Sequence, residues 1–177
     1  MSANKTLTLI FFVITMCLKF QVLAQGKIDL AKINFSEGIG GILKNVQGIH
    51  EGKLSGSQDM VSHGFDNDGS FTFAGIVPGH IELLSWNGKL AGYAFKIRTF
   101  IDQQKVAGFF KHKYAKAGVQ TSKLMEVYRY RDDQVAAELR FVVEEKFNEG
   151  ASGYLDVKSA DFAKVFEQMT ERQRLKN

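Results

Sequence analysis

The sequence predicts an α+β protein that is mainly antiparallel β and carries an amphipathic helix near its C-terminus. Residues 61–101 alternate apolar and polar side chains and are divided by three favoured turn pairs, Asp68-Gly69, Pro78-Gly79 and Asn87-Gly88. Residues 159–173 instead space their apolar side chains as a helix does. The composition, 45% hydrophobic and 24% charged over 177 residues, is that of a globular domain. We expect the strands to form hairpins or a meander, arranged as a sandwich or as a barrel-like sheet.

The first 24 residues have the pattern of a cleaved signal peptide. Lys5 precedes an apolar run of 12 residues from Leu7 to Leu18, whereas a helix that spans a bilayer needs ~20. Val22-Leu23-Ala24 presents small or modest side chains at the positions that a signal peptidase recognises, which predicts cleavage after Ala24. An uncleaved membrane anchor is the alternative. We therefore expect an exported protein, in the bacterial periplasm or outside the cell, without a transmembrane span after cleavage.

Cleavage would change the composition of the working protein. It leaves 153 of the 177 residues and removes Lys5 and Lys19 but no acid, so the formal net charge falls from +4 to +2. It also removes Cys17, the single cysteine. The mature chain therefore has no disulfide or thiol chemistry, which fits a bacterial envelope better than a eukaryotic secretory route. Its near-neutral charge argues against a nucleic-acid partner.

Residues 25–60 are the least regular part of the sequence. Ser36 is a candidate cap for a helix with an apolar face at i, i+3, i+4 and i+7, formed by Ile39, Ile42, Leu43 and Val46. The glycines at positions 38, 40 and 41 weaken that helix. Residues 51–60 indicate a loop or a weak strand. We expect this N-terminal segment to pack as an edge helix or loop on an antiparallel domain formed by residues 61–177.

Two hairpins are expected between residues 61 and 101. The first joins Val61–Phe65 to Ser70–Ala74 through an Asp-Gly turn, where glycine supplies a positive φ without steric cost. The second joins His80–Trp86 to Lys89–Ile101 through Asn87-Gly88. The stretch Asp66-Asn-Asp-Gly also has the composition of a calcium loop, but an EF-hand needs glycine and glutamate at positions where Phe71 and Val77 stand.

Residues 102–118 fit two structures. Asp102 could cap a helix that ends at Gly118, with one face formed by Val106, Phe110 and Tyr114. The same residues also alternate as a strand does, and of the two we expect the strand.

Residues 133–149 pose the same alternative, because their apolar positions fit a period of 2 while their alanine and glutamate content favours a helix. Residues 124–131 form a clear strand pattern, and Asp132-Asp133 could close a turn. We therefore expect a hairpin over residues 123–146.

The C-terminal part has the clearest pattern. Tyr154–Val157 is a short strand, and Ser159 is a candidate cap for a helix over residues 159–173. Its apolar stripe is formed by Phe162, Val165, Phe166 and Met169. The sequence shows no internal repeat.

The stretch Asp66–Leu84 joins a D-x-D-G-x-F-x-F pattern to a P-G turn and an alternating strand. The pattern is formed by Asp68, Gly69, Phe71, Phe73, Pro78, Gly79 and Leu83. It resembles the turn–strand–turn–strand signature of carboxypeptidase-regulatory-like (prealbumin-like) β-sandwich modules of exported proteins. Ile81 stands where tyrosine is usual, and one proline replaces the usual pair. The resemblance implies an exported module with a binding or structural role and supplies no catalytic residues.

Motifs for metal, cofactor or phosphate binding are missing from the sequence. The histidines at positions 50, 63, 80 and 112 lack the spacing of metal ligands, and there is no P-loop, G-x-G-x-x-G or G-x-S-x-G. We therefore expect no metal and no cofactor. The candidates for ligand binding are imidazole and aromatic side chains on predicted strands: His63, His80, Trp86, Tyr128 and Tyr130.

These observations favour a non-enzymatic exported binding or accessory module, with a protein or a small apolar molecule of the cell envelope as its ligand. A small envelope hydrolase is the alternative, and it requires His63, His80, Asp66 and Glu82 to converge in one cleft. A structural cell-surface protein is a third possibility.

Two segments, residues 111–116 and 128–131, mix basic and aromatic residues. In a strand, Tyr128 and Tyr130 would share one face and Arg129 and Arg131 the other.

Overall fold

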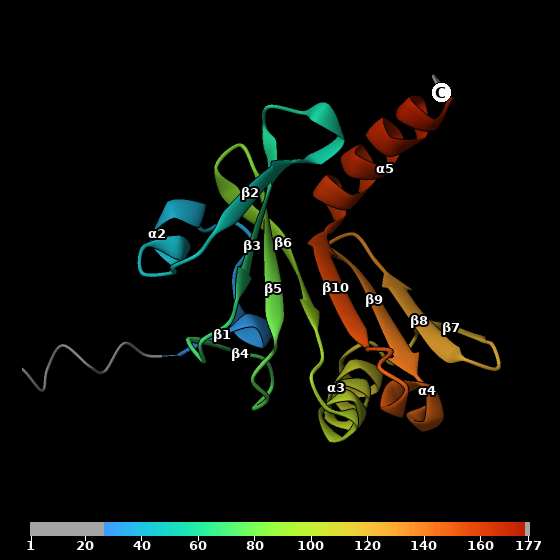
Figure 1. Ribbon diagram of the computed structural model, residues 1–177. Coiled ribbons are helices and arrows are strands. Elements are labelled where there is room, and N and C mark those ends of the chain that lie inside the picture. Colours follow the sequence, from blue (N-terminus) through green and yellow to red (C-terminus); the bar gives the residue numbers. More distant parts are fainter. Residues whose placement is uncertain (1–26, 176–177) are drawn as a thin grey trace, which may run out of the picture.

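The computed structural model describes residues 27–175 and shows an α+β fold built on one large antiparallel sheet (Figure 1). The strands are β1 (Ile28–Asp29), β2 (His50–Lys53), β3 (Met60–Asp66), β4 (Phe71–Thr72), β5 (His80–Trp86), β6 (Lys89–Lys96), β7 (Gly118–Thr121), β8 (Met125–Arg131), β9 (Val135–Val142) and β10 (Tyr154–Ser159). The helices are α2 (Ile39–Leu43), α3 (Phe100–Lys113), α4 (Glu144–Asn148) and α5 (Ala160–Arg174), with 3₁₀ turns η1 (Leu30–Lys32) and η2 (Leu54–Gly56). The predicted fold class is confirmed, whereas the predicted signal peptide, residues 1–24, lies outside the described residues.

Eight strands form the main sheet in the order β2-β3-β5-β6-β10-β9-β8-β7, and β1 and β4 form a separate parallel pair. The sheet is open, with β2 and β7 at its edges. The chain builds the sheet in two similar halves, because β2, β3, β5 and β6 precede α3 just as β7, β8, β9 and β10 precede α5. The last strand of each half lies in the middle of the sheet. This architectural repeat has no counterpart that we detect in the sequence.

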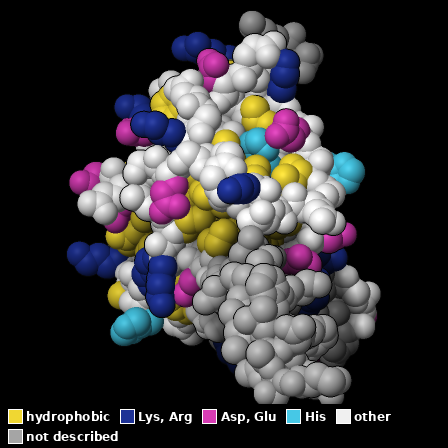
Figure 2. Space-filling view, turned by 90° about the vertical axis from the view of Figure 1, so that its left-hand side faces the viewer, with side chains coloured by type: hydrophobic (Ala, Val, Ile, Leu, Met, Phe, Trp, Pro, Cys, Tyr) yellow, Lys and Arg dark blue, Asp and Glu magenta, His cyan; other side chains and the backbone are white. Residues whose placement is uncertain are grey.

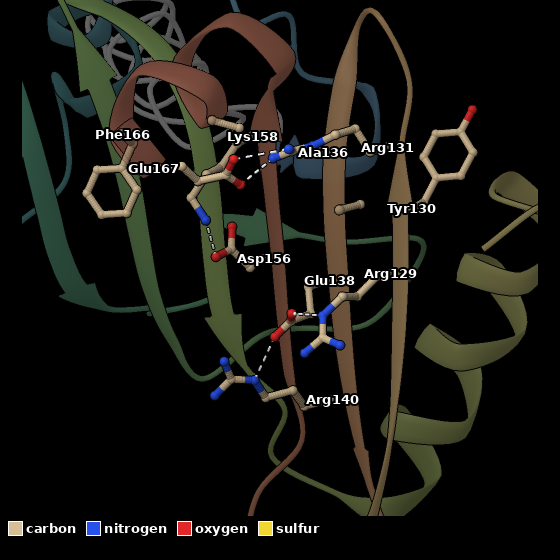
Figure 3. A pocket seen from close by; sticks show the side chains of 12 residues that line it. Arg129, Tyr130, Arg131, Ala136, Glu138, Arg140, Asp156, Lys158, Phe166 and Glu167 are labelled. Atoms are coloured by element: carbon tan, nitrogen blue, oxygen red, sulfur yellow. Dashed lines mark hydrogen bonds and ion pairs between the residues drawn. The ribbon is translucent and has the colours of Figure 1, made fainter. Parts of the chain in front are cut away.

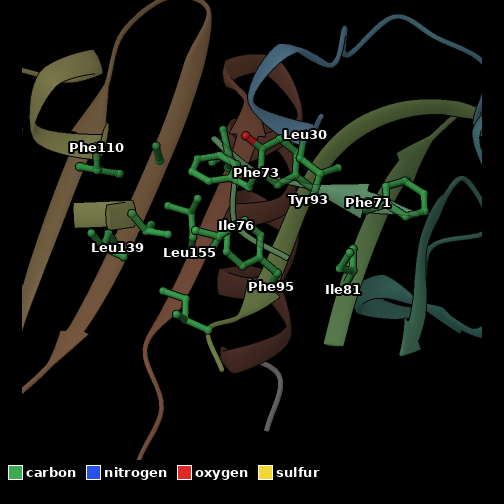
Figure 4. Close-up of a cluster of buried hydrophobic side chains, with 14 of the residues drawn as sticks. Leu30, Phe71, Phe73, Ile76, Ile81, Tyr93, Phe95, Phe110, Leu139 and Leu155 are labelled. Atoms are coloured by element: carbon green, nitrogen blue, oxygen red, sulfur yellow. The ribbon is translucent and has the colours of Figure 1, made fainter. Parts of the chain in front are cut away.

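The hydrophobic core lies on one face of the sheet, which we call the core face. Strands β5, β6, β9 and β10 contribute Leu83, Tyr93, Phe95, Leu139 and Leu155, all buried. Phe73 packs into the same cluster, with its ring centroid 5.1 Å from that of Phe95 (Figure 4). Its ring centroid also lies 4.9 Å from that of Phe109 of α3. Helix α3, the turn η1 and residues 71–76 therefore cover the core face.

The opposite face carries a smaller apolar cluster under α5. Phe162 is fully buried there against Met60, Leu84 and Ala91. Helix α5 begins where β10 ends and lies at the other end of the sheet from α3 and α4 (Figure 1). Its predicted cap is confirmed, because the Ser159 side chain accepts a hydrogen bond from Phe162 N. The rest of this face is polar, and we call it the polar face.

The hairpin predicted at Asn87-Gly88 is confirmed. Strands β5 and β6 pair antiparallel on either side of it, and Asn87 and Gly88 have φ values of 51° and 73°. Two successive positive φ angles are those of a type I′ turn, whose twist matches that of the strands. The register of β5 and β6 shifts between Leu84 and Ser85, which marks a β-bulge. At this bulge the Ala91 side chain packs into the apolar cluster under α5.

The hairpin predicted across residues 61–74 is wrong. Strand β3 pairs with β2 and β5, whereas β4 pairs with β1. The buried Asn67 side chain prevents a tight turn, since it donates to Phe71 O and Pro78 O and accepts from Gly69 N and Phe71 N. These bonds hold the segment as a loop. The predicted alternation along residues 70–74 is nevertheless correct about burial, because the side chains of Phe71 and Phe73 are both buried in the core.

The strand expected over residues 102–118 is also wrong, because most of this segment belongs to helix α3. Thr99 caps the helix by accepting a hydrogen bond from Asp102 N at 3.1 Å. The buried residues are Gln103, Val106, Ala107 and Phe110, which have helical spacing. A polar glutamine in this stripe hides the helical pattern from a sequence analysis. Only Gly118 of the predicted range lies in a strand, β7.

The hairpin expected over residues 123–146 is confirmed by the antiparallel pair of β8 and β9.

In the N-terminal segment, α2 begins after Gly38 rather than at Ser36. Its residues Ile39, Ile42 and Leu43 pack, together with Val46, on the core as an edge helix would. Figure 2 views the molecule from the side of α2 and β2 and shows apolar side chains gathered between singly placed charged ones. Strand β2 makes residues 50–53 part of the main sheet.

We expect Gln103→Leu to lower the free energy of unfolding by about 2–4 kcal/mol, because it leaves two buried backbone groups without partners. Gln103 Nε2 donates to Val142 O at 2.8 Å, and Oε1 accepts from Val142 N at 3.0 Å. Urea denaturation measures the change, with the exposed neighbour variant Gln104→Leu as the matched control. Equal stability of the two variants would contradict the assigned role of this side chain.

Candidate functional site

The five side chains that the sequence nominates for ligand binding do not meet in one place. Tyr128 and Tyr130 lie on the core face, where Tyr130 stacks on Tyr114 at 4.7 Å. Trp86 instead packs near Phe162 of α5, at 6.3 Å between ring centroids. The remaining two, His63 and His80, are separated by the sheet itself.

His63 and His80 contact different carboxylates on opposite sides of the sheet. His80 Nδ1 lies 3.0 Å from Asp66 Oδ1 at the exposed end of β5, and the two residues are in register. His63 is buried beside β2. On β5 the residue paired with His63 is Leu83, so the side chains of these two residues lie on the same face. Glu82 is the neighbour of Leu83 and therefore points to the opposite face. The four residues named for a hydrolase therefore do not converge.

His63 belongs instead to a hydrogen-bonded chain that joins three strands. Its Nδ1 lies 3.0 Å from Glu51 Oε1 on β2, and its Nε2 lies 2.9 Å from Ser85 Oγ on β5. This is the order of acid, base and hydroxyl that activates a serine nucleophile. However, Ser85 is only 3% exposed and His63 only 5%. The sequence could not reveal this chain, because its members meet only through the pairing of β2, β3 and β5.

A gathering of seven charged side chains lies on the polar face, between strands β8–β10 and helix α5. It forms an open groove of about 550 Å³, which we call the charged groove (Figure 3). Its charged lining consists of Arg129, Arg131, Glu138, Arg140, Asp156, Lys158 and Glu167. Ala136, Ala163 and Phe166 add an apolar wall. The lining therefore offers four cations and three carboxylates.

Ion pairs hold these side chains in place. Glu138 accepts from Arg129 Nε at 2.7 Å and from Arg140 Nε at 2.8 Å. Arg131 forms a double contact with Glu167 of α5, and Lys158 pairs with Asp156 (Figure 3). The two Nη groups of Arg140 have no acceptor among residues 27–175. The groove thus contains guanidinium donors that point away from the existing pairs.

Two carboxylates face each other across the floor of the groove. Asp156 of β10 is directly opposite Glu138 of β9 in the register. Like charges at such positions are destabilising unless cations compensate them. Asp156 Oδ1 is also buried without a hydrogen-bond partner in the described structure. Such a local conflict is typical of a functional surface rather than of a purely structural one.

The neighbouring cations control the titration of Glu138. Burial alone would raise the pKa of Glu138, but hydrogen bonds and charge from Arg140 and Arg129 outweigh it and hold this pKa below its usual value of 4.5. Burial, assisted by Glu82 and Asp156, raises the pKa of the nearby Tyr154 to about 12. At neutral pH Glu138 in the groove is therefore ionised, and the nearby Tyr154 phenol is neutral.

A second hollow of about 650 Å³ lies at the end of the sheet near α4. Its lining includes Asp66, His80, Lys96 and Arg98, together with residues 150–152. Both hollows are open to solvent and have charged side chains in their lining. In the described part of the chain, no three His, Cys, Asp or Glu side chains gather as a metal site requires.

Comparison of the chain with models of known protein families, with curated proteins and with solved structures gave no match in any of the three. Among residues 27–175, no helix combines the length and the hydrophobicity that crossing a membrane requires.

The charged groove gives the stability a defined pH dependence. A carboxyl with a lowered pKa in the folded state stabilises the protein above its unfolded value, and this contribution is lost as the pH falls through the folded value. We therefore expect Glu138→Gln to be less stable than the native protein at neutral pH, with the gap closing as the pH falls below 4.5. Thermal unfolding at several pH values measures it, and the exposed Glu171→Gln serves as control. A gap independent of pH would contradict this account.

Proposed function

We propose that this protein is an exported, non-enzymatic binding module and that the charged groove binds a carboxylate-bearing ligand. One observation carries the proposal: three guanidinium groups and one ammonium group gather around a single open groove. Arginine recognises carboxylates through parallel N–H donors, and the free Nη groups of Arg140 offer that geometry.

The existing ion pairs are compatible with exchange for a ligand. Arg131, Arg140 and Glu167 keep more than half of their side-chain surface exposed, and pairs of this kind contribute about 0–1 kcal/mol. A ligand carboxylate can therefore replace or supplement them at small cost. Phe166 and Ala136 provide apolar surface for the hydrocarbon part of the ligand. This chemistry favours a polar, anionic ligand over the apolar one considered from the sequence.

Export is supported by the pattern of residues 1–24, with an apolar run followed by a small-residue cleavage site. An exported binding module would act in a bacterial periplasm or outside the cell. The ligand would then be a carboxylate-bearing component of that compartment or of a partner protein in it.

We expect 4-fluorobenzoate to bind in the charged groove, because its carboxylate suits Arg140 and its ring suits Phe166. Fluorine NMR titration measures the affinity, with 4-fluorobenzylamine as the probe of opposite charge. Arg140→Gln should weaken binding at least about tenfold, since a charge-assisted pair contributes about 1.5–3 kcal/mol. Arg174→Gln, an exposed change near the C-terminal end of α5, should leave it unchanged. Equal binding of the amine, or no binding of the acid, would reject the proposal.

A hydrolase is the second candidate, favoured by the Glu51–His63–Ser85 chain. Its weakness is access, since the hydroxyl of Ser85 is buried and lies outside both hollows. We therefore assign the chain a stabilising role, in which it fastens edge strand β2 to β3 and β5.

Ser85→Ala should then lower the free energy of unfolding by about 1–3 kcal/mol, because it leaves buried His63 Nε2 without its partner. Denaturation with urea measures this loss. The native protein should remain unlabelled by a fluorophosphonate probe, as read by mass spectrometry. A covalent adduct at Ser85 would instead establish the hydrolase.

A further inference from the structure

Strand β7 is an edge of the main sheet that lacks the usual protection. It pairs with β8 on one side and with no described strand on the other. All four of its residues are exposed. Edge strands are commonly protected by lysine, proline or inward-pointing charge. The other edge, β2, carries Glu51 and Lys53, whereas β7 reads Gly-Val-Gln-Thr and carries no charge.

The backbone groups that face outward from β7 can be assigned from the register. Ser122 N donates to Met125 O, and this pair continues the β7–β8 register. Antiparallel pairs alternate between hydrogen-bonded and non-hydrogen-bonded positions. Gln120 therefore pairs with β8, while Val119 and Thr121 direct their N–H and C=O groups away from the sheet.

Exposed apolar side chains gather on the same hairpin. The large hydrophobic residues that remain exposed in the described chain are Val77, Ile101, Val119, Leu124, Met125 and Leu175. Three of these six belong to the β7–β8 hairpin. Val119 is 54% exposed and Leu124 51%. Apolar surface beside an open backbone edge is typical of a binding surface.

The surroundings of β7 are strongly basic. Residues 111–131 contain one acid, Glu126, and six basic residues: Lys111, Lys113, Lys116, Lys123, Arg129 and Arg131. This segment alone carries more positive charge than the net +4 of the chain. The charge reaches both faces, because Lys111 lies 4.8 Å from the Tyr128 ring on the core face and Arg129 donates to Gln120 on the polar face.

We propose that the β7 edge binds an extended acidic segment of a partner protein as an added strand. The segment would pair its backbone with Val119 and Thr121. Its alternating side chains would then reach basic groups on either face. A second copy of this chain fits poorly, because two basic edges would meet and repel. The backbone pairing uses groups outside the charged groove, although two of the basic side chains, Arg129 and Arg131, also line that groove.

The test uses a fluorescein-labelled decapeptide of alternating glutamate and valine, with fluorescence anisotropy as the measurement. Thr121→Pro removes one outward N–H and leaves the Gln120 pairing with β8 intact. We expect it to weaken binding about tenfold, whereas Thr121→Val, which retains the N–H, and Arg174→Gln should bind as the native protein does. Lys111→Gln should weaken binding of the decapeptide and make that binding less sensitive to added salt than in the native protein. Lys44→Gln is its control.

The same peptide with alternate N-methylated amides should not bind, because it cannot complete the ladder. Thermal unfolding of Thr121→Pro checks that the fold persists. Undiminished binding of the methylated peptide, an equal affinity of Thr121→Pro, or no binding of the decapeptide to the native protein would overturn the inference. Binding to anionic phospholipid vesicles that is unaffected by Thr121→Pro, without peptide binding, would overturn it in favour of a membrane surface.

Discussion

The pairing of β6 with β10 is the constraint on which the rest of the structure depends. It joins the two halves of the sheet over five positions, from Lys96↔Tyr154 to Gly92↔Lys158. Gly92 is required at its end, since a β-carbon there would lie 2.8 Å from Val157 O. Because side chains alternate along a strand, placing Phe95 and Leu155 in the core also places Asp156 and Lys158 on the opposite face.

The charged groove follows from this alternation and from the direction in which α5 leaves β10. Helix α5 begins directly after Ser159 and lies on the polar face, whereas residues 97–99 carry α3 to the core face. The two helices therefore break the symmetry of the two halves. One half has its polar face partly walled by Phe166 and Glu167, which turns a solvated strand surface into a groove.

Local signals in the sequence were sufficient where local interactions decide the structure. Asn87-Gly88 predicted its hairpin, Ser159 predicted the start of α5, and the alternation of Tyr128 and Arg129 predicted their opposite faces correctly. Long-range bonds decide the other cases. Gln103 joins α3 to β9, and Asn67 joins a loop to Pro78. The groove could not be predicted, because it depends on β9 lying between β8 and β10.

Arg129 connects the two surfaces to which we assign binding. Its Nε donates to Glu138 in the charged groove, and its Nη1 donates to Gln120 on the edge strand. A strand added beside β7 would place alternate side chains next to Gln120 and thus extend the polar face beyond Arg129. Any ligand carboxylate that draws Arg129 away from Glu138 would also alter its bond to β7. The same guanidinium therefore gives a physical route by which occupancy of one surface changes the other.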